Sequence, residues 1–167
     1  NIVRVHDDPD CCVRNEEPRS LMAEDGGLDI AVEMNSLAKS HNMAGWGVGV
    51  IIGNAQRVDE ILRFKSNMDS GMFYPMQEAA AYALDNLSEE WFEELNGIYY
   101  EREKAAKKIL DAMGCTYDEH QAGLFLLAKI PDSFEGNCFD FSDKYLYGCG
   151  VFATPALIFG SVGERYI

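Results

Sequence analysis

The chain has 167 residues, of which 47% are hydrophobic, and this length and composition allow one folded domain with a sizeable core. Its 28 acidic and 14 basic residues give a formal net charge of −14, which opposes binding to nucleic acid or to an anionic membrane surface. The five cysteines show no Cys-x-x-Cys spacing and no apolar run is long enough to span a membrane, so we expect a reduced, cytoplasmic protein.

Strand and loop patterns occupy the first third of the chain. A strand is predicted over Asn1–His6, ending at Asp7, and an irregular segment over residues 11–27, where a proline and paired glycines interrupt any regular pattern. The short apolar run Ile30–Met34 predicts a buried strand, and Val48–Ile52 predicts a second strand bracketed by glycines.

Three helices with apolar stripes follow. The first is predicted over residues 55–67, the second is opened by Pro75, and the third extends from a Ser88 cap to Gly114. The remaining predicted elements are short: a strand at 123–130, a helix at 141–147, and strands at 151–154 and 165–167. Together these elements predict an α/β protein.

The polar loop between the predicted strands Ile30–Met34 and Val48–Ile52 contains Lys39. A lysine just past the carboxyl end of a buried strand lies where open α/β sheets bind ligands. Desolvation there would lower its pKa and allow its amine to attack a carbonyl. A lone lysine in a loop is more often a solvated surface residue, so this position alone does not decide the chemistry.

The residues around Lys39 resemble the lysine segment of class I/II aminotransferases, which are fold type I enzymes that use pyridoxal 5'-phosphate (PLP). The family segment reads Ser-x-Ser-Lys, a short loop, then Gly-Trp-Arg-x-Gly, and this chain has Ser-Leu-Ala-Lys at 36–39 and Gly-Trp-Gly-Val-Gly at 45–49. The similarity continues through residues 63–73 and 121–125 and covers nearly the whole chain. The branch that looks most similar contains LL-diaminopimelate-, aspartate- and alanine-type aminotransferases.

The resemblance implies an α/β fold built from part of the large-domain mixed sheet of fold type I transferases and a small α+β C-terminal domain. Residues 1–106 would belong to the large domain and residues 107–167 to the small one. The strand at 48–52 would run antiparallel to its neighbours. Both ends of the chain look cut inside strands, and we expect it to correspond to the second half of a family chain about twice as long.

Three residues inherit functional roles from the resemblance. Asp7 would pair with the protonated pyridine nitrogen of PLP, which lets the ring act as an electron sink. Ser36 would donate a hydrogen bond to the phosphate. Lys39 would hold the cofactor covalently and, once freed, move a proton between the substrate Cα and the cofactor. The implied reaction is amino-group transfer between an amino acid and a 2-oxo acid, with no metal, in a homodimer or together with the missing N-terminal half.

Three other positions depart from the family pattern. Asp10 replaces the tyrosine that hydrogen-bonds the ring oxygen of PLP, and an ionised carboxylate near that charged oxygen is repulsive. Ala38 removes one phosphate donor, and Gly47 replaces the phosphate-binding arginine. Because each charge-assisted hydrogen bond contributes about 1.5–3 kcal/mol, loss of the arginine could weaken PLP binding by roughly ten- to a hundredfold.

These departures support a rival interpretation, in which the chain is a non-catalytic fragment or degenerate homologue that keeps only the scaffold or a dimer surface. Our hypothesis is that the family assignment is right and that the isolated chain has little or no transaminase activity. Other fold type I reactions, such as β-lyase or decarboxylation, share the same motif. Weaker alternatives are a Mg²⁺ cluster at Asp7, Asp8 and Asp10 and a dinucleotide loop at residues 45–49.

Overall fold

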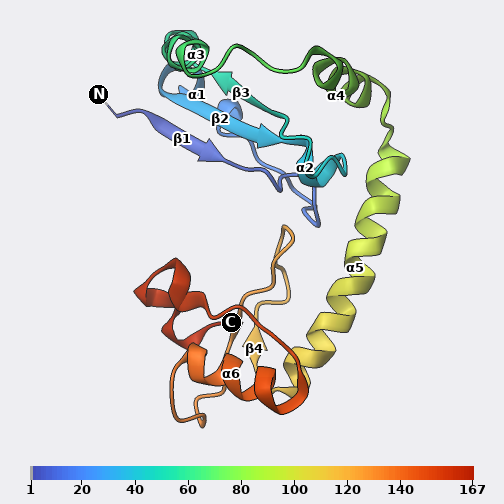
Figure 1. Cartoon of the computed structure of the whole chain (residues 1–167), viewed down its shortest axis with the longest axis vertical. Coiled ribbons are helices and arrows are strands. Elements are labelled where there is room, and N and C mark those ends of the chain that lie inside the picture. The colour runs from blue at the N-terminus through green and yellow to red at the C-terminus, as the bar shows by residue number, and fades with distance from the viewer. Residues whose placement is uncertain (1) are drawn as a thin grey trace. The chain divides into compact units, whose positions relative to one another are not determined.

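The computed structural model describes residues 2–167, so the first residue of the strand predicted from Asn1 lies outside the described part. The chain divides into two compact units (Figure 1). The first contains the residues up to Gly97 together with 122–124, and the second contains residues 98–121 and 125–167. The domain boundary proposed between residues 106 and 107 stays a prediction.

A three-stranded mixed sheet forms the centre of the first unit (Figure 1). Its strands are β1 (Arg4–Asp7), β2 (Ala31–Ser36) and β3 (Gly49–Gly53), in the spatial order β1-β2-β3. β1 and β2 are parallel, whereas β3 runs antiparallel to β2. The predicted strands, the α/β class and the antiparallel direction of β3 are therefore confirmed.

The connection between β1 and β2 is mostly irregular, as predicted. It contains the 3₁₀ turn η1 (Leu21–Ala23) and the one-turn helix α1 (Gly27–Ile30). Because Ile30 ends α1, the strand that was predicted to begin there begins at Ala31.

The segment after β2 is not the polar loop that the sequence predicted. It forms the one-turn helix α2 (Leu37–Ser40). Ser36 is its N-cap, because its hydroxyl oxygen accepts a hydrogen bond from the backbone N–H of Ala38 at 3.1 Å. The N–H of His41 closes the turn on the carbonyl of Leu37 at 3.3 Å. Lys39, which was expected in a loop, therefore lies in a regular helical turn that Ser36 caps.

The three long helices match the predicted ones to within one or two residues. They are α3 (Ala55–Met68), α4 (Tyr74–Asn86) and α5 (Glu89–Ala112). The small alanines of α4 allow close packing, and Ala80 joins a buried cluster with Leu37, Met43 and Val48. In the core of the first unit, α4 therefore packs directly against the segment that follows β2.

The second unit has a small antiparallel ribbon and one helix. The ribbon pairs β4 (Thr116–Tyr117) with β5 (Ala128–Lys129), and the helix α6 spans Cys138–Cys149. Two 3₁₀ segments follow, η2 (Ala156–Phe159) and η3 (Ser161–Arg165). The core contains residues from α6, from the ribbon and the positions beside it, and from the chain end: Met113, Cys115, Ala128, Ile130, Cys138, Phe141 and Ile167.

Several short elements of this unit were predicted wrongly. The strand predicted at 123–130 is confined to β5, the one predicted at 151–154 is irregular, and that at 165–167 is reduced to a single bridge between Tyr166 and Lys129. The Gln121 side chain explains the first error, because it accepts a hydrogen bond from the Leu127 N–H at 2.7 Å and donates to the Leu127 carbonyl at 3.0 Å. The Gln121 amide therefore makes the hydrogen bonds with the Leu127 backbone that a neighbouring strand would otherwise make.

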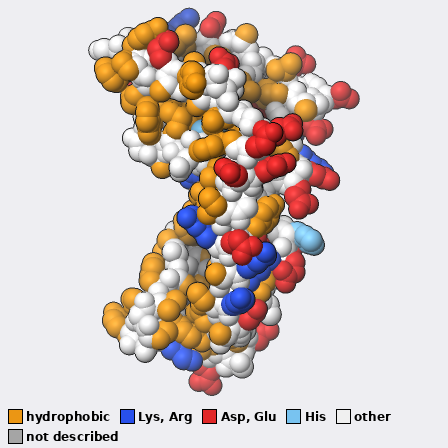
Figure 2. Space-filling view, turned by 90° about the vertical axis from the view of Figure 1, so that its right-hand side faces the viewer, with side chains coloured by type: hydrophobic (Ala, Val, Ile, Leu, Met, Phe, Trp, Pro, Cys, Tyr) orange, Lys and Arg blue, Asp and Glu red, His pale blue; other side chains and the backbone are white. Residues whose placement is uncertain are grey.

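No helix within residues 2–167 combines the length and the apolar character needed to cross a membrane. Large apolar side chains are nevertheless abundant on the surface, as the orange areas of Figure 2 show. In the first unit they include Val5 and Ile52 on the sheet and Leu62 and Phe64 on α3.

Candidate active site

The structure brings the three predicted site residues to one edge of the sheet. Asp7 is the last residue of β1 and Ser36 the last residue of β2. These strands are parallel and Asp7 is opposite Met34 in the register, so their carboxyl ends lie at the same edge. Lys39 follows within α2, which begins directly after β2. An edge of this kind is where open α/β sheets bind ligands.

The side chains of Asp7 and Lys39 are both available for a ligand. Lys39 is half-buried and Asp7 is exposed. Within residues 2–167, neither the Lys39 ammonium nor the Asp7 carboxylate makes a hydrogen bond or an ion pair. A half-buried amine and a carboxylate without partners among the described residues, at one strand edge, are suited to bind a group that has both an electrophilic carbon and a basic ring nitrogen.

Ser36 has one strong hydrogen bond and one long one. Its oxygen accepts from Ala38 N–H as the cap of α2, and its hydroxyl donates to the Val48 carbonyl over 3.5 Å. The long donor contact is weak. The hydroxyl proton can therefore turn to an incoming anion while the oxygen still caps the helix.

The backbone that supports Lys39 is fixed by contacts from α5. The Trp91 indole Nε1 donates to the carbonyl of the buried Ser40 at 3.2 Å. His41 packs edge-on against Phe92 with ring centroids 5.5 Å apart, and burial lowers the pKa of His41. Sequence reasoning missed this support, because Trp91 and Ser40 are 51 positions apart and no local pattern connects them.

The turn after β1 contains a carboxylate atom that the structure leaves unpaired. Asp10 Oδ1 is buried and has no hydrogen-bond partner among the described residues. A buried polar atom without a partner is unfavourable, and more so for an ionised carboxylate. By resemblance, Asp10 stands where a tyrosine would approach the ring oxygen of PLP, so this position does not fit the cofactor.

Gly47 is the second position that fits PLP poorly. Its φ is +67°, in the left-handed region that favours glycine, and apart from its chain neighbours no atom of the described residues lies within 4 Å of the place a Cβ would occupy. Space for a longer side chain exists, but the backbone conformation disfavours one. Taken together, Asp7, Ser36 and Lys39 fit PLP in chemical type, whereas Asp10 and Gly47 do not contribute to binding it.

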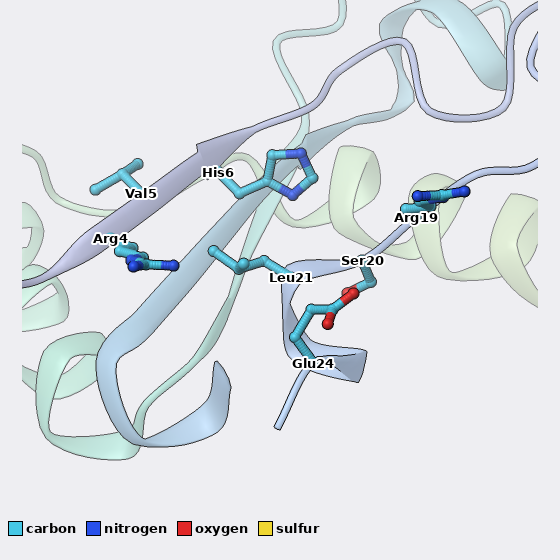
Figure 3. A pocket seen from close by; sticks show the side chains of 7 residues that line it. All are labelled: Arg4, Val5, His6, Arg19, Ser20, Leu21 and Glu24. Carbon is cyan, nitrogen blue, oxygen red and sulfur yellow. The ribbon is translucent and has the colours of Figure 1, made fainter. Parts of the chain in front are cut away.

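A surface pocket of about 420 Å³ lies elsewhere, between β1 and residues 19–24 (Figure 3). Arg4 and His6 line it from β1. Side chains alternate along a strand, so His6 lies on the face opposite to Asp7. The pocket is therefore separate from the edge that brings Asp7, Ser36 and Lys39 together.

The buried Glu33 carboxylate contacts His6, which lines this pocket, and fixes Ser20 and Leu21 to the sheet. Glu33 Oε2 is 3.1 Å from His6 Nδ1 and accepts hydrogen bonds from the Ser20 hydroxyl at 2.8 Å and the Leu21 N–H at 3.0 Å. Burial raises the pKa of Glu33, but the hydrogen bonds from these three donors outweigh burial and hold the pKa below its usual value. A charged residue inside a run predicted to be buried was the one sequence sign of this network.

A metal site is not assembled from the usual ligands in the described part of the chain. Within residues 2–167, no group of three His, Cys, Asp or Glu side chains is placed to hold a metal ion. The alternative Mg²⁺ cluster at Asp7, Asp8 and Asp10 is therefore not formed.

Comparisons with known proteins point to one family. The family model described as "Aminotransferase class I and II" matches residues 8–165. LL-diaminopimelate aminotransferase from Oleidesulfovibrio alaskensis is 36% identical over 99% of this chain, and the enzyme of that name from Natranaerobius thermophilus is 35% identical over 90%. These alignments cover 43% and 38% of the two relatives, so the chain spans less than half the length of the curated relatives it matches.

Solved structures show the same similarity in three dimensions. The apo structure of BacF from Bacillus subtilis superposes with a TM-score of 0.89 at 30% identity, covering 99% of this chain and 42% of that one. A Staphylococcus aureus aminotransferase gives a TM-score of 0.85 at 25% identity and covers 97% of this chain and 43% of its own. The predicted fold class, part of a fold type I transferase, is thereby confirmed.

Proposed function

The chain belongs to the class I and II aminotransferase family, and from that premise we propose that it supplies the lysine-bearing part of an amino-group-transfer site that binds PLP. Members of this family are generally PLP-dependent. The observation that carries the proposal is the shared sheet edge: two parallel strands in register end at Asp7 and Ser36, and the amine of Lys39, which has no partner within residues 2–167, follows in the next turn.

PLP, when bound, supplies an electrophilic carbon for covalent attachment and a ring that withdraws electrons from the substrate Cα. Lys39 Nζ would hold the cofactor and would act as the base that accepts and returns the Cα proton. The Asp7 carboxylate would keep a proton on the ring nitrogen through a charge-assisted hydrogen bond. The Ser36 hydroxyl would donate to the phosphate, and the Trp91–Ser40 contact keeps the Lys39 turn in position.

The substrates in this proposal are an α-amino acid and a 2-oxo acid. The matched relatives are named LL-diaminopimelate aminotransferases, which suggests an amino acid with a second polar end. We further propose that the protein works in the cytoplasm and that its site is completed by other parts of a longer chain or by a second subunit. On its own, the 167-residue chain should have little or no turnover.

The proposal is tested by titrating the chain with PLP and following the absorbance of the bound cofactor, using Lys39→Ala and the matched control Lys65→Ala. Lys65 is an exposed lysine of the same unit, on α3, and it pairs with Asp69 directly after that helix. We expect a saturable band in the parent and in Lys65→Ala, and no band in Lys39→Ala. Equal bands in all three proteins would mean that Lys39 is not the attachment point.

A second candidate function is a scaffold without catalysis, and the buried unpaired oxygen of Asp10 favours it. An ionised carboxylate there opposes a negatively charged ring oxygen. This candidate predicts no saturable band in the parent chain at any PLP concentration. It also predicts that Asp10→Tyr creates no binding.

A further inference from the structure

Two cysteines in the turn after β1 form a close pair that the proposed function does not use. Cys11 and Cys12 are adjacent in sequence, both are half-buried, and their Sγ atoms are 3.4 Å apart and share a hydrogen bond. The sulfur atoms of neighbouring residues need not point the same way. This separation therefore reflects a turn that directs both thiols to one place.

The surroundings make the two thiols unequal. The Asn35 amide donates a hydrogen bond to Cys11 Sγ at 2.9 Å and another to the Asp8 carbonyl at 3.2 Å, so a fixed donor points at the Cys11 sulfur. Burial, the contact with Cys11 and the nearby Asp8 carboxylate raise the pKa of Cys12 to about 11. The Cys12 carbonyl accepts from the Asn96 side chain at 3.1 Å, which fixes the backbone of the pair.

We propose that Cys11 and Cys12 form a vicinal dithiol site that small-molecule disulfides oxidise reversibly to an intrachain disulfide. Cys11 is the attacking residue and Cys12 the resolving one. Neither the family nor the proposed aminotransfer site requires this chemistry. The inference therefore does not depend on whether PLP binds.

The reaction balances with the small disulfide as the oxidant. The Cys11 thiolate attacks one sulfur of the disulfide, breaks its S–S bond and expels one thiolate, leaving a mixed disulfide on Cys11. Cys12 loses its proton and attacks Cys11 Sγ, forming the bond between the two residues and expelling the second thiolate. The two cysteine protons end on the two released thiols. The cysteine sulfurs lose two electrons, and the small disulfide gains them.

Such a bond would be easily reduced again. Adjacent Cα atoms across a trans peptide are about 3.8 Å apart, below the roughly 4.4–6.8 Å that disulfides usually span. Strained disulfides have more oxidising potentials and are the labile kind. The pair is thus suited to cycle with the thiol–disulfide balance around it rather than to act as a permanent crosslink.

The other cysteines allow the reactivity of the pair to be compared with that of single thiols in the same chain. Cys115 and Cys138 are buried in the core of the second unit, whereas Cys149 is exposed. Reactivity at Cys149 therefore reports how strongly the solution oxidises an ordinary accessible thiol. Cys149→Ser serves as the matched control variant, because it removes a cysteine without touching the pair.

The test is oxidation of the whole chain by glutathione disulfide, raised until Cys149 is labelled, followed by non-reducing mass spectrometry of the tryptic peptide 5–14 that contains both cysteines. We expect this peptide to lose two hydrogens and to regain them with dithiothreitol, in the parent and in Cys149→Ser alike. This first measurement needs no variant of the pair, so a folding defect in a variant cannot obscure it.

Variants then assign the two roles. Cys12→Ser should retain a glutathione adduct on Cys11, whereas in Cys11→Ser the remaining Cys12 should react roughly tenfold more slowly, because burial and the nearby Asp8 carboxylate still disfavour its thiolate. A peptide 5–14 that stays reduced while Cys149 is labelled would overturn the proposal. So would glutathione adducts that persist on both cysteines of the parent chain.

Discussion

At the scale of single residues, Glu33 contributes most to fixing the segment before β2. Its Oε2 atom meets His6, Ser20 and Leu21, and the side chain is buried. A buried charge is tolerated only when hydrogen bonds replace its water, and Glu33 has several such contacts. Removing the charge should therefore destabilise the first unit rather than change the chemistry at the sheet edge.

We predict that Glu33→Gln lowers the free energy of unfolding by about 1–3 kcal/mol at neutral pH, because hydrogen bonds to a charged group contribute about that much. The pKa of Glu33 is lower in the folded state than in the unfolded chain. Its contribution is thus complete above the unfolded value, near about 4.3, and is lost as the pH falls through the folded value. Urea unfolding at neutral and acidic pH measures this difference.

The exposed Glu17, which is paired with the exposed Arg19, provides the control. Glu17→Gln should change stability by less than about 0.5 kcal/mol at either pH. A Glu33→Gln effect that persisted undiminished in acid would contradict the assigned role of the carboxylate charge.

Gly47 allows the missing phosphate contact to be restored. Gly47→Arg has open space around its Cβ but must adopt a positive φ, which costs about 1–2 kcal/mol of folding stability. We predict that it strengthens PLP binding by roughly tenfold, as a charge-assisted hydrogen bond of about 1.5–3 kcal/mol allows. Gly47→Ala should show the same loss of stability without the gain in binding. Equal PLP affinity in both variants would show that the side chain at 47 does not reach the phosphate.

At the scale of elements, the contact between α5 and α2 keeps the lysine turn in position. Trp91 is in the first turn of α5, and its indole donates to the carbonyl of Ser40, which lies next to Lys39. We predict that Trp91→Phe costs about 1 kcal/mol of stability through the lost hydrogen bond. It should also weaken PLP binding, because the Lys39 turn becomes less ordered. Thermal unfolding and the PLP titration measure the two effects, and unchanged PLP affinity would separate Trp91 from the site.

The elements also show which features the sequence can predict. Helices α3 to α5 were predicted well because their caps, apolar stripes and ends are local signals. Helix α6 was predicted three residues too short at its start, although Asn137 and Asp140 form a capping box that was visible in the sequence. The strand predicted around Leu127 failed because the Gln121 side chain, and not a strand, pairs with that backbone.

Some residues of the candidate site could likewise be predicted from the sequence, and others could not. Asp7, Ser36 and Lys39 could be placed because strand ends and a family motif identify them, and the parallel register then explains why they share an edge. Glu33 and the Trp91–Ser40 contact could not be predicted. Each depends on residues far apart in the chain that only the fold brings together.

At the scale of the whole molecule, the first unit presents apolar surface on its sheet and helices. Val5 is 60% exposed, Ile52 49% and Phe64 68%. Exposed apolar side chains and open strand edges favour association. We therefore predict that the purified chain self-associates as its concentration rises, which sedimentation velocity would show. A strictly monomeric chain across a wide range of concentrations would contradict this expectation.

The most direct test of the central claim is to locate the cofactor by chemistry. The chain is incubated with PLP, reduced with borohydride, digested and mapped by mass spectrometry. If Lys39 is the attachment point, one reduced cofactor is found on the peptide that contains Lys39 at PLP concentrations that leave Lys65 unmodified, and Asp7→Asn lowers the yield. Labelling spread evenly over the exposed lysines, with Lys39 no more reactive than Lys65, would contradict the account.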